Sequence, residues 1–88
     1  MINPEPIYLK AITHWGEQGQ IDMAIEECAE LIVALQHMRR DRVNTDAVAS
    51  EIADVLIMCG QMRLLVGPKA VDAMFEEKLA RLAGRLSA

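Results

Sequence analysis

Four carboxylates, arranged as two pairs one helical turn apart, are the side chains of this 88-residue chain best suited to chemistry. Glu27 and Glu30 belong to a Glu-Glu-x-x-Glu run that begins at Glu26, and Glu51 and Asp54 form the second pair. Residues three apart lie on one face of a helix, so two antiparallel helices can set the pairs opposite each other. A divalent cation would offset the resulting repulsion, and ligands that are all oxygen suit Mg²⁺, with Mn²⁺ as a substitute. Each pair by itself is equally typical of a solvated helix face.

The composition predicts that helices carry these pairs. Aromatic residues make up only 3% of the chain, and β-branched residues are sparse beside Ala, Leu, Met, Glu and Arg, a balance that favours helix over strand. Capping residues, glycines and prolines mark four helices joined by short turns, which predicts one all-α domain over residues 1–88, built as an antiparallel four-helix bundle. The expected helices run from Pro4 to about Glu17, from about Ile21 to Arg40, from Thr45 to about Val66, and from Pro68 to about Leu86.

The apolar stripes of the two middle helices indicate where the carboxylates point. On the third helix the stripe centres on Val55, with Glu51 only about 40° from that centre and Asp54 about 100° away on the same side. A carboxylate inside an apolar stripe must be protonated, paired or bound to a cation, because burying an unpaired charge is costly. The expected core residues are Val48, Ile52, Val55, Cys59, Met62 and Val66 on this helix and Ile21, Ala24, Cys28, Leu31, Leu35 and Met38 on the second.

The last helix offers the opposite charge. Lys78 lies on its predicted buried face, and Arg81 follows one turn later. Two interpretations of Lys78 are open: it pairs with Glu51 or a neighbouring acid, or it contacts a phosphate beside the metal. A polyphosphate carried on Mg²⁺ would use the carboxylates and the cations together. The residues expected to be buried on this helix are Val71, Phe75, Leu82 and Leu86.

Charge and hydropathy argue against several classes of protein. The net charge is −4, from 13 acidic and 9 basic residues, which disfavours a nucleic-acid binder that neutralises phosphates. No apolar run approaches the roughly 18 residues of a membrane span, and no secretory signal is recognisable. Cys28 and Cys59 form no ligand motif and are predicted to be buried free thiols in a reducing compartment. We therefore expect a cytoplasmic protein with no nucleic-acid or membrane partner.

The spacing of the two acidic pairs resembles the signature of the MazG-like, all-α nucleoside triphosphate pyrophosphohydrolases. That family carries Glu-Glu-x-x-Glu and, after a variable gap, Glu-x-x-Asp. Here the first motif runs from Glu26 to Glu30, and after twenty intervening residues the second runs from Glu51 to Asp54. The surrounding segments, AIEECAELIVAL and SEIADVLIM, are also similar to the family's second and third helices. The likeness spans roughly residues 10 to 85.

The resemblance implies an activity. It is the Mg²⁺-dependent hydrolysis of a nucleoside triphosphate, with ribose or deoxyribose, between its α- and β-phosphates. The products are the monophosphate and pyrophosphate, and the family is associated with the removal of unwanted or excess nucleotides. The implied metal ligands are Glu27, Glu30, Glu51 and Asp54.

The same resemblance assigns roles to the other candidate residues. Glu26 would be an auxiliary acid that orients a ligand or the attacking water, and it joins Glu27 and Lys78 in the implied catalytic set. Lys78, with Arg81 as the second candidate, would contact phosphate. His14 and Trp15 would contact the nucleotide base, although the helical spacing of Trp15 also fits a core position.

A second apolar face on the third helix predicts self-assembly. Ala53, Ile57 and Leu64 lie roughly 160–180° from the centre of its core stripe. A helix that is apolar on both sides is expected to be buried on both sides, which a chain of this length cannot achieve alone. We therefore expect a homodimer or a homotetramer formed as a dimer of dimers.

Other functions are also compatible with the sequence. A dUTPase or a phosphoribosyl-ATP pyrophosphohydrolase could be built on the same scaffold, and a non-catalytic helical interaction module would leave the acids solvated. A di-iron carboxylate bundle is disfavoured because it uses Glu-x-x-His pairs, and alanines stand three residues before both His14 and His37.

Overall fold

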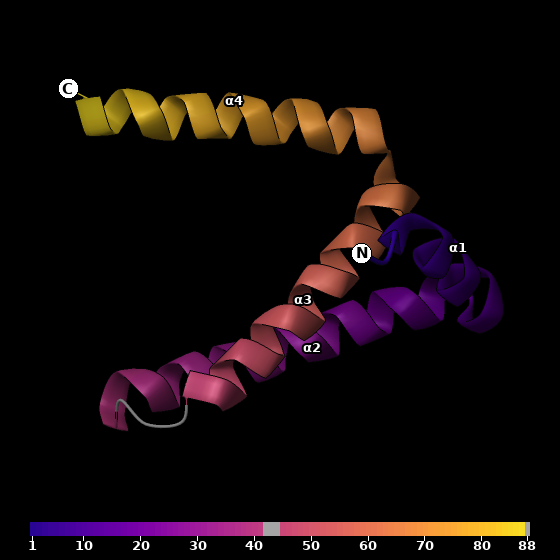
Figure 1. Ribbon diagram of the computed structural model, residues 1–88, viewed down its shortest axis with the longest axis horizontal. Helices are drawn as coiled ribbons and strands as arrows, with labels where there is room; N and C mark the ends of the chain where they lie inside the picture. Colours follow the sequence, from indigo (N-terminus) through magenta and orange to yellow (C-terminus); the bar gives the residue numbers. More distant parts are fainter. Residues whose placement is uncertain (42–44, 88) are drawn as a thin grey trace.

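The computed structural model describes residues 1–41 and 45–87, and within those ranges it contains four helices and no strand. They are α1 (Pro4–Trp15), α2 (Glu17–Asp41), α3 (Thr45–Val66) and α4 (Pro68–Ser87). The predicted all-α class is confirmed, and the ends of α3 and α4 fall at or within one residue of the predicted positions. Figure 1 shows α2 and α3 as a long antiparallel hairpin, with α1 near one end and α4 projecting beyond α3.

The first helix begins and ends at residues whose chemistry marks the boundary. The Asn3 side chain accepts a hydrogen bond from the backbone N–H of Glu5 (3.3 Å), which caps the start of α1. Gly16 ends the helix with a φ of 85° and donates its N–H to the Ile12 carbonyl (2.8 Å). This single glycine reverses the chain because it can adopt a positive φ without strain. The next helix, α2, begins at Glu17 and not near the predicted Ile21, so Gly19 lies inside it.

Two contacts determine how α1 and α2 meet α3. The Tyr8 ring of α1 lies so close to Gly60 of α3 that a Cβ at this position would overlap the ring. Gln20 of α2 donates a hydrogen bond from its side-chain nitrogen to the side-chain oxygen of Gln61 on α3, and both residues are buried. Because a buried amide requires a partner, this pair favours one register between α2 and α3.

The seam between α2 and α3 is rotated by roughly 50° on each helix from the predicted stripes. The expected core positions Ile21, Cys28, Leu35, Ile52, Cys59 and Val66 are wrong, because all six residues are exposed. The prediction of buried thiols is wrong for the same reason. The rotation turns Glu27 and Glu51 further into the seam. Each helix carries more apolar surface than one seam can bury, so the rest of that surface is exposed. The buried and half-buried positions are Gln20, Ala24, Glu27, Leu31, Ala34 and Met38 on α2 and Val48, Glu51, Asp54, Val55, Met58, Gly60, Gln61, Met62, Arg63, Leu64 and Leu65 on α3.

The last helix differs most from expectation. Within the described ranges, α4 packs against α3 and against no other helix, and it extends away from the hairpin (Figure 1). The predicted buried face is wrong at three positions, since Phe75, Leu82 and Leu86 are exposed and only Val71 is half-buried.

The direction of α4 follows from the turn before it. Gly67 has a φ of 135° and donates its N–H to the Arg63 carbonyl (3.0 Å), which ends α3 and allows Pro68 to start the next helix. The Arg63 guanidinium then donates two hydrogen bonds to the Asp72 carboxylate, each 2.7 Å long, across this turn. A bidentate Arg–carboxylate pair has a defined orientation, so it holds the first turn of α4 at a set angle to α3.

The close approach at Gly60 gives a direct test of this packing. We expect Gly60→Ala to lower the free energy of unfolding by about 1–3 kcal/mol, because the added methyl group overlaps the Tyr8 ring. Gly84→Ala is the matched control, since nothing lies within 4 Å of a Cβ there, and it should leave stability unchanged or raise it by up to about 1 kcal/mol. Thermal unfolding followed by circular dichroism measures both. Equal effects of the two variants would contradict the α1–α3 contact.

Candidate metal-binding site

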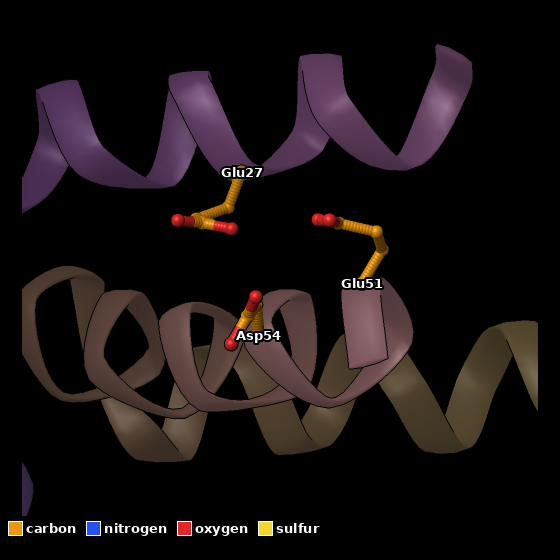
Figure 2. A group of neighbouring side chains, drawn as sticks. All are labelled: Glu27, Glu51 and Asp54. Carbon is orange, nitrogen blue, oxygen red and sulfur yellow. The ribbon is translucent and has the colours of Figure 1, made fainter. Parts of the chain in front are cut away.

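Three of the predicted ligands converge in the seam between α2 and α3. Glu27 comes from α2, and Glu51 and Asp54 come from α3. Figure 2 shows their carboxylates directed into the space between the two helices. One oxygen from each of the three lies within 4.8 Å of the others. The rotation of the seam strengthens this convergence, because the predicted stripe places Glu51 about 40° and Asp54 about 100° from its centre, and the rotation turns both toward the line of contact.

The two glutamates of the cluster are half-buried, and one carboxylate oxygen of each lacks a hydrogen-bond partner among the described residues. One oxygen of Glu27 and one of Glu51 are inaccessible to solvent and accept no hydrogen bond from the described residues. Such atoms are unusual, because buried polar groups are normally hydrogen-bonded. Among the described residues the only ion pair joins Arg63 to Asp72, so no lysine or arginine in that set neutralises the cluster.

Burial and mutual repulsion raise the pKa of both glutamates. For Glu27 the pKa rises mainly because the carboxylate is desolvated, and further because Glu30, Asp54 and Glu51 are negatively charged. For Glu51 desolvation again dominates, followed by the charges of Glu30 and Asp54. All four predicted ligands therefore interact electrostatically, although the exposed Glu30 lies outside the closest group of three.

The donor set fits a hard divalent cation. All of its groups are carboxylates, which Mg²⁺ and Mn²⁺ prefer, and no His or Cys belongs to the cluster. Neighbouring ligand oxygens on one octahedral Mg²⁺ lie about 3.0 Å apart and opposite ones about 4.2 Å apart. The three oxygens lie within 4.8 Å of one another, so they would have to move closer together by up to about 1.8 Å to bind one ion. A cation there would also supply partners for the two buried oxygens. We conclude that Glu27, Glu51 and Asp54, with Glu30 beside them, form a candidate Mg²⁺ site.

The structure leaves the predicted phosphate-binding residues away from this cluster. Lys78 and Arg81 are exposed on α4, which does not contact α2 in the described part of the chain. The interpretation that Lys78 pairs with Glu51 is not supported, since no such ion pair is present between these described residues. Lys78 does share a face with Phe75, as the helical spacing predicts, but this face is open to solvent.

The predicted base-binding residues lie at the end of α1. The His14 and Trp15 rings are 4.8 Å apart and perpendicular to each other. Trp15 is 65% exposed, so its alternative interpretation as a core residue is wrong. The start of α2, which follows these residues in the chain, lies about 15 Å along that helix from Glu27, at 1.5 Å per residue. Glu26 is exposed and points roughly 100° around α2 from Glu27.

Comparison with known proteins adds no assignment: none of the protein-family models, curated protein sequences or solved structures that were compared matches this chain. In the ranges that the structure describes, no helix is both long enough and apolar enough to cross a membrane.

The closest carboxylate group contains no residue that the sequence analysis had omitted. The buried Gln20–Gln61 pair, which it did omit, carries no spacing signal that separates it from other polar helix positions.

The raised pKa of Glu51 predicts how stability depends on pH without metal. A carboxyl group whose folded-state pKa is raised binds its proton more tightly when folded. The metal-free protein should therefore gain stability as the pH falls from 7 toward the ordinary glutamate value of 4.5. In Glu51→Gln this gain should be smaller and the melting temperature at pH 7 higher. Melting curves recorded in EDTA at several pH values measure both, and a profile identical to that of the unmodified chain would contradict the repulsion.

Proposed function

We propose that this chain is a Mg²⁺-dependent nucleoside triphosphate pyrophosphohydrolase, which converts a ribo- or deoxyribonucleoside triphosphate to the monophosphate and pyrophosphate. The observation that carries the proposal is the convergence of Glu27, Glu51 and Asp54 with two buried oxygens that lack partners. The order and spacing of the acidic motifs, which resemble the MazG-like signature, support the same activity. A role in clearing nucleotides from the cytoplasm is part of the proposal.

The proposed mechanism gives the acidic residues two tasks, metal binding and proton transfer. Glu27, Glu30, Glu51 and Asp54 would hold Mg²⁺. The bound ion would draw negative charge from the phosphates and favour in-line attack by water. Glu27 would accept a proton from this water, with the exposed Glu26 orienting a ligand or the water.

The basic and aromatic residues of the proposal bind the substrate. Lys78 and Arg81 would contact phosphate oxygens, and His14 and Trp15 would contact the base. Because α4 is remote from α2 within one chain, the phosphate contacts require either movement of α4 or an α4 from another copy. A homodimer or homotetramer, with Ala53, Ile57 and Leu64 in one interface, is accordingly part of the proposal.

Two other functions compete with this one. A dUTPase or a phosphoribosyl-ATP pyrophosphohydrolase would use the same carboxylates, and a substrate panel scored for pyrophosphate release separates the three. A non-catalytic interaction module is favoured by a different observation, the large number of exposed apolar residues on α2, α3 and α4. It predicts no response to metal.

Removal of one carboxylate tests the catalytic proposal. We expect Glu51→Gln to lower pyrophosphate release by about 100-fold or more, because the variant loses a charged ligand in the centre of the cluster. Glu77→Gln, which makes the same chemical change on exposed α4, is the matched control and should retain activity. The assay measures pyrophosphate and orthophosphate from a nucleoside triphosphate panel with Mg²⁺. Full activity in Glu51→Gln would rule out the proposed site.

Metal binding can be tested separately from turnover. At 100 times its dissociation constant, Mg²⁺ should stabilise the folded chain by about 2.7 kcal/mol. The rise in melting temperature should disappear in Glu51→Gln and persist in Glu77→Gln. Melting curves with Mg²⁺ and with EDTA measure the effect. If Mg²⁺ leaves the curve of the unmodified chain unchanged, the interaction module becomes the better account.

A further inference from the structure

Two neutral amides lie in the same seam as the carboxylate cluster. Gln20 of α2 and Gln61 of α3 are 5% and 4% exposed, and the side-chain nitrogen of Gln20 donates a hydrogen bond to the side-chain oxygen of Gln61. They are the only buried polar residues among the described positions. Two apolar residues of similar shape would be about as stable there, because burying an amide removes it from water. The stability of the seam therefore does not by itself account for the amide pair.

The amide pair has the same spacing from the carboxylate cluster on both helices. Glu27 follows Gln20 by seven residues on α2, and Asp54 precedes Gln61 by seven residues on α3. Seven residues are about two helical turns, so each amide shares a helix face with one of the acids and lies about 10 Å from it along the helix. The register that sets Gln20 opposite Gln61 is therefore the register that sets Glu27 opposite Asp54.

The amide pair lies at the open end of the α2–α3 hairpin. At the other end the chain itself joins the two helices, after Asp41 and before Thr45, and α1 lies beside the open end (Figure 1). The carboxylate cluster lies between the two ends. Without a cation, repulsion within the cluster therefore acts to separate α2 from α3 toward the end at which the chain does not join them.

The amides resist such a movement better than their apolar neighbours do. The nearby seam positions Ala24, Met58 and Met62 are apolar, and apolar contact has no preferred direction. A hydrogen bond between two side chains is lost when its atoms separate by about 1 Å. Because both amides are buried, losing this bond would leave two polar groups without partners, which is costly.

We propose that Gln20 and Gln61 are positioning residues of the carboxylate site, and that their hydrogen bond holds α2 and α3 in the register that keeps the acids together before a cation binds. This role rests on the proposed function, in which the acids hold Mg²⁺. A buried polar pair is known to fix the register of packed helices at some cost in stability. Holding the acids in place in advance raises the affinity for the cation, because binding then does not have to bring the helices together.

Replacing the amides by methionine separates their effect on the site from their effect on stability. Methionine is unbranched like glutamine and has nearly the same helix propensity. Gln20→Met and Gln61→Met should each lower the melting temperature, because each leaves one buried amide unpaired. The double variant should recover it, since both partners are then apolar. In all three variants the dissociation constant for Mg²⁺ should rise about 10-fold or more, as when groups that hold metal ligands in place are removed.

Thermal unfolding in EDTA and calorimetric titration of Mg²⁺ measure these two quantities. Gln36→Met is the matched control, because Gln36 is exposed on α2 about 180° around the helix from Glu27, and it should leave the affinity for Mg²⁺ unchanged. If the double variant regains both its melting temperature and the affinity of the unmodified chain, the amides contribute to stability alone and the positioning role is overturned.

A distance measured without metal tests the same role independently of cation binding. Cys28 of α2 and Cys59 of α3 are exposed, so nitroxide labels on them report the separation of the two helices by electron paramagnetic resonance. The labelled chain is diluted into unlabelled chain, so that only distances within one chain are recorded. In EDTA the unmodified chain should give one narrow distance, and the double methionine variant a longer or broader one. Adding Glu51→Gln to that variant should narrow the distribution again, because it removes part of the repulsion.

These outcomes distinguish the positioning role from the proposed metal site. Distances that the double methionine variant leaves unchanged would overturn the positioning role even in a chain that binds Mg²⁺. A broader distribution in a chain that binds no Mg²⁺ would support the amides as the groups that hold the acids together and would reject the metal site.

Discussion

Repulsion among carboxylates in a half-buried seam is the constraint on which the rest of this chain depends. Glu27, Glu51 and Asp54 approach within 4.8 Å at the contact between the two longest helices, and two of their buried oxygens have no hydrogen-bond partner among the described residues. Like charges that share a desolvated site raise each other's pKa and destabilise the folded state unless something offsets them. A cation bound there, as we propose, would offset this repulsion.

The same arrangement links the site to the shape of the molecule. The acids and the Gln20–Gln61 amides point into the seam, and apolar residues are turned outward. The described core therefore contains only two buried hydrophobic residues, Val48 and Met58. A hairpin with so small a core gains little from hydrophobic burial by itself. The exposed apolar residues of α2 and α3 are thus a consequence of placing the carboxylates inside, whereas the direction of α4 depends on Gly67 and the Arg63–Asp72 pair.

Local signals predicted most of the fold, and long-range packing accounts for the errors. Asn3, Gly16 and the Gly67–Pro68 step mark helix ends through their own backbone preferences, which act without tertiary contacts. The carboxylate cluster followed from spacing of three residues on two adjacent helices. The seam could not be derived this way, because both helices are apolar over wide arcs and periodicity then leaves the contact direction open. The direction of α4 depends on the Arg63–Asp72 pair, which spans nine residues and has no periodic signature.

Calorimetric titration of Mg²⁺, or of Mn²⁺ as its substitute, into the metal-free chain tests the central claim most directly. Our account predicts saturable binding to the unmodified chain and its loss in Glu27→Gln, in which only one carboxylate oxygen of the cluster is replaced. An absence of saturable binding, or equal affinity in the variant, would contradict the claim that these acids converge to hold a cation.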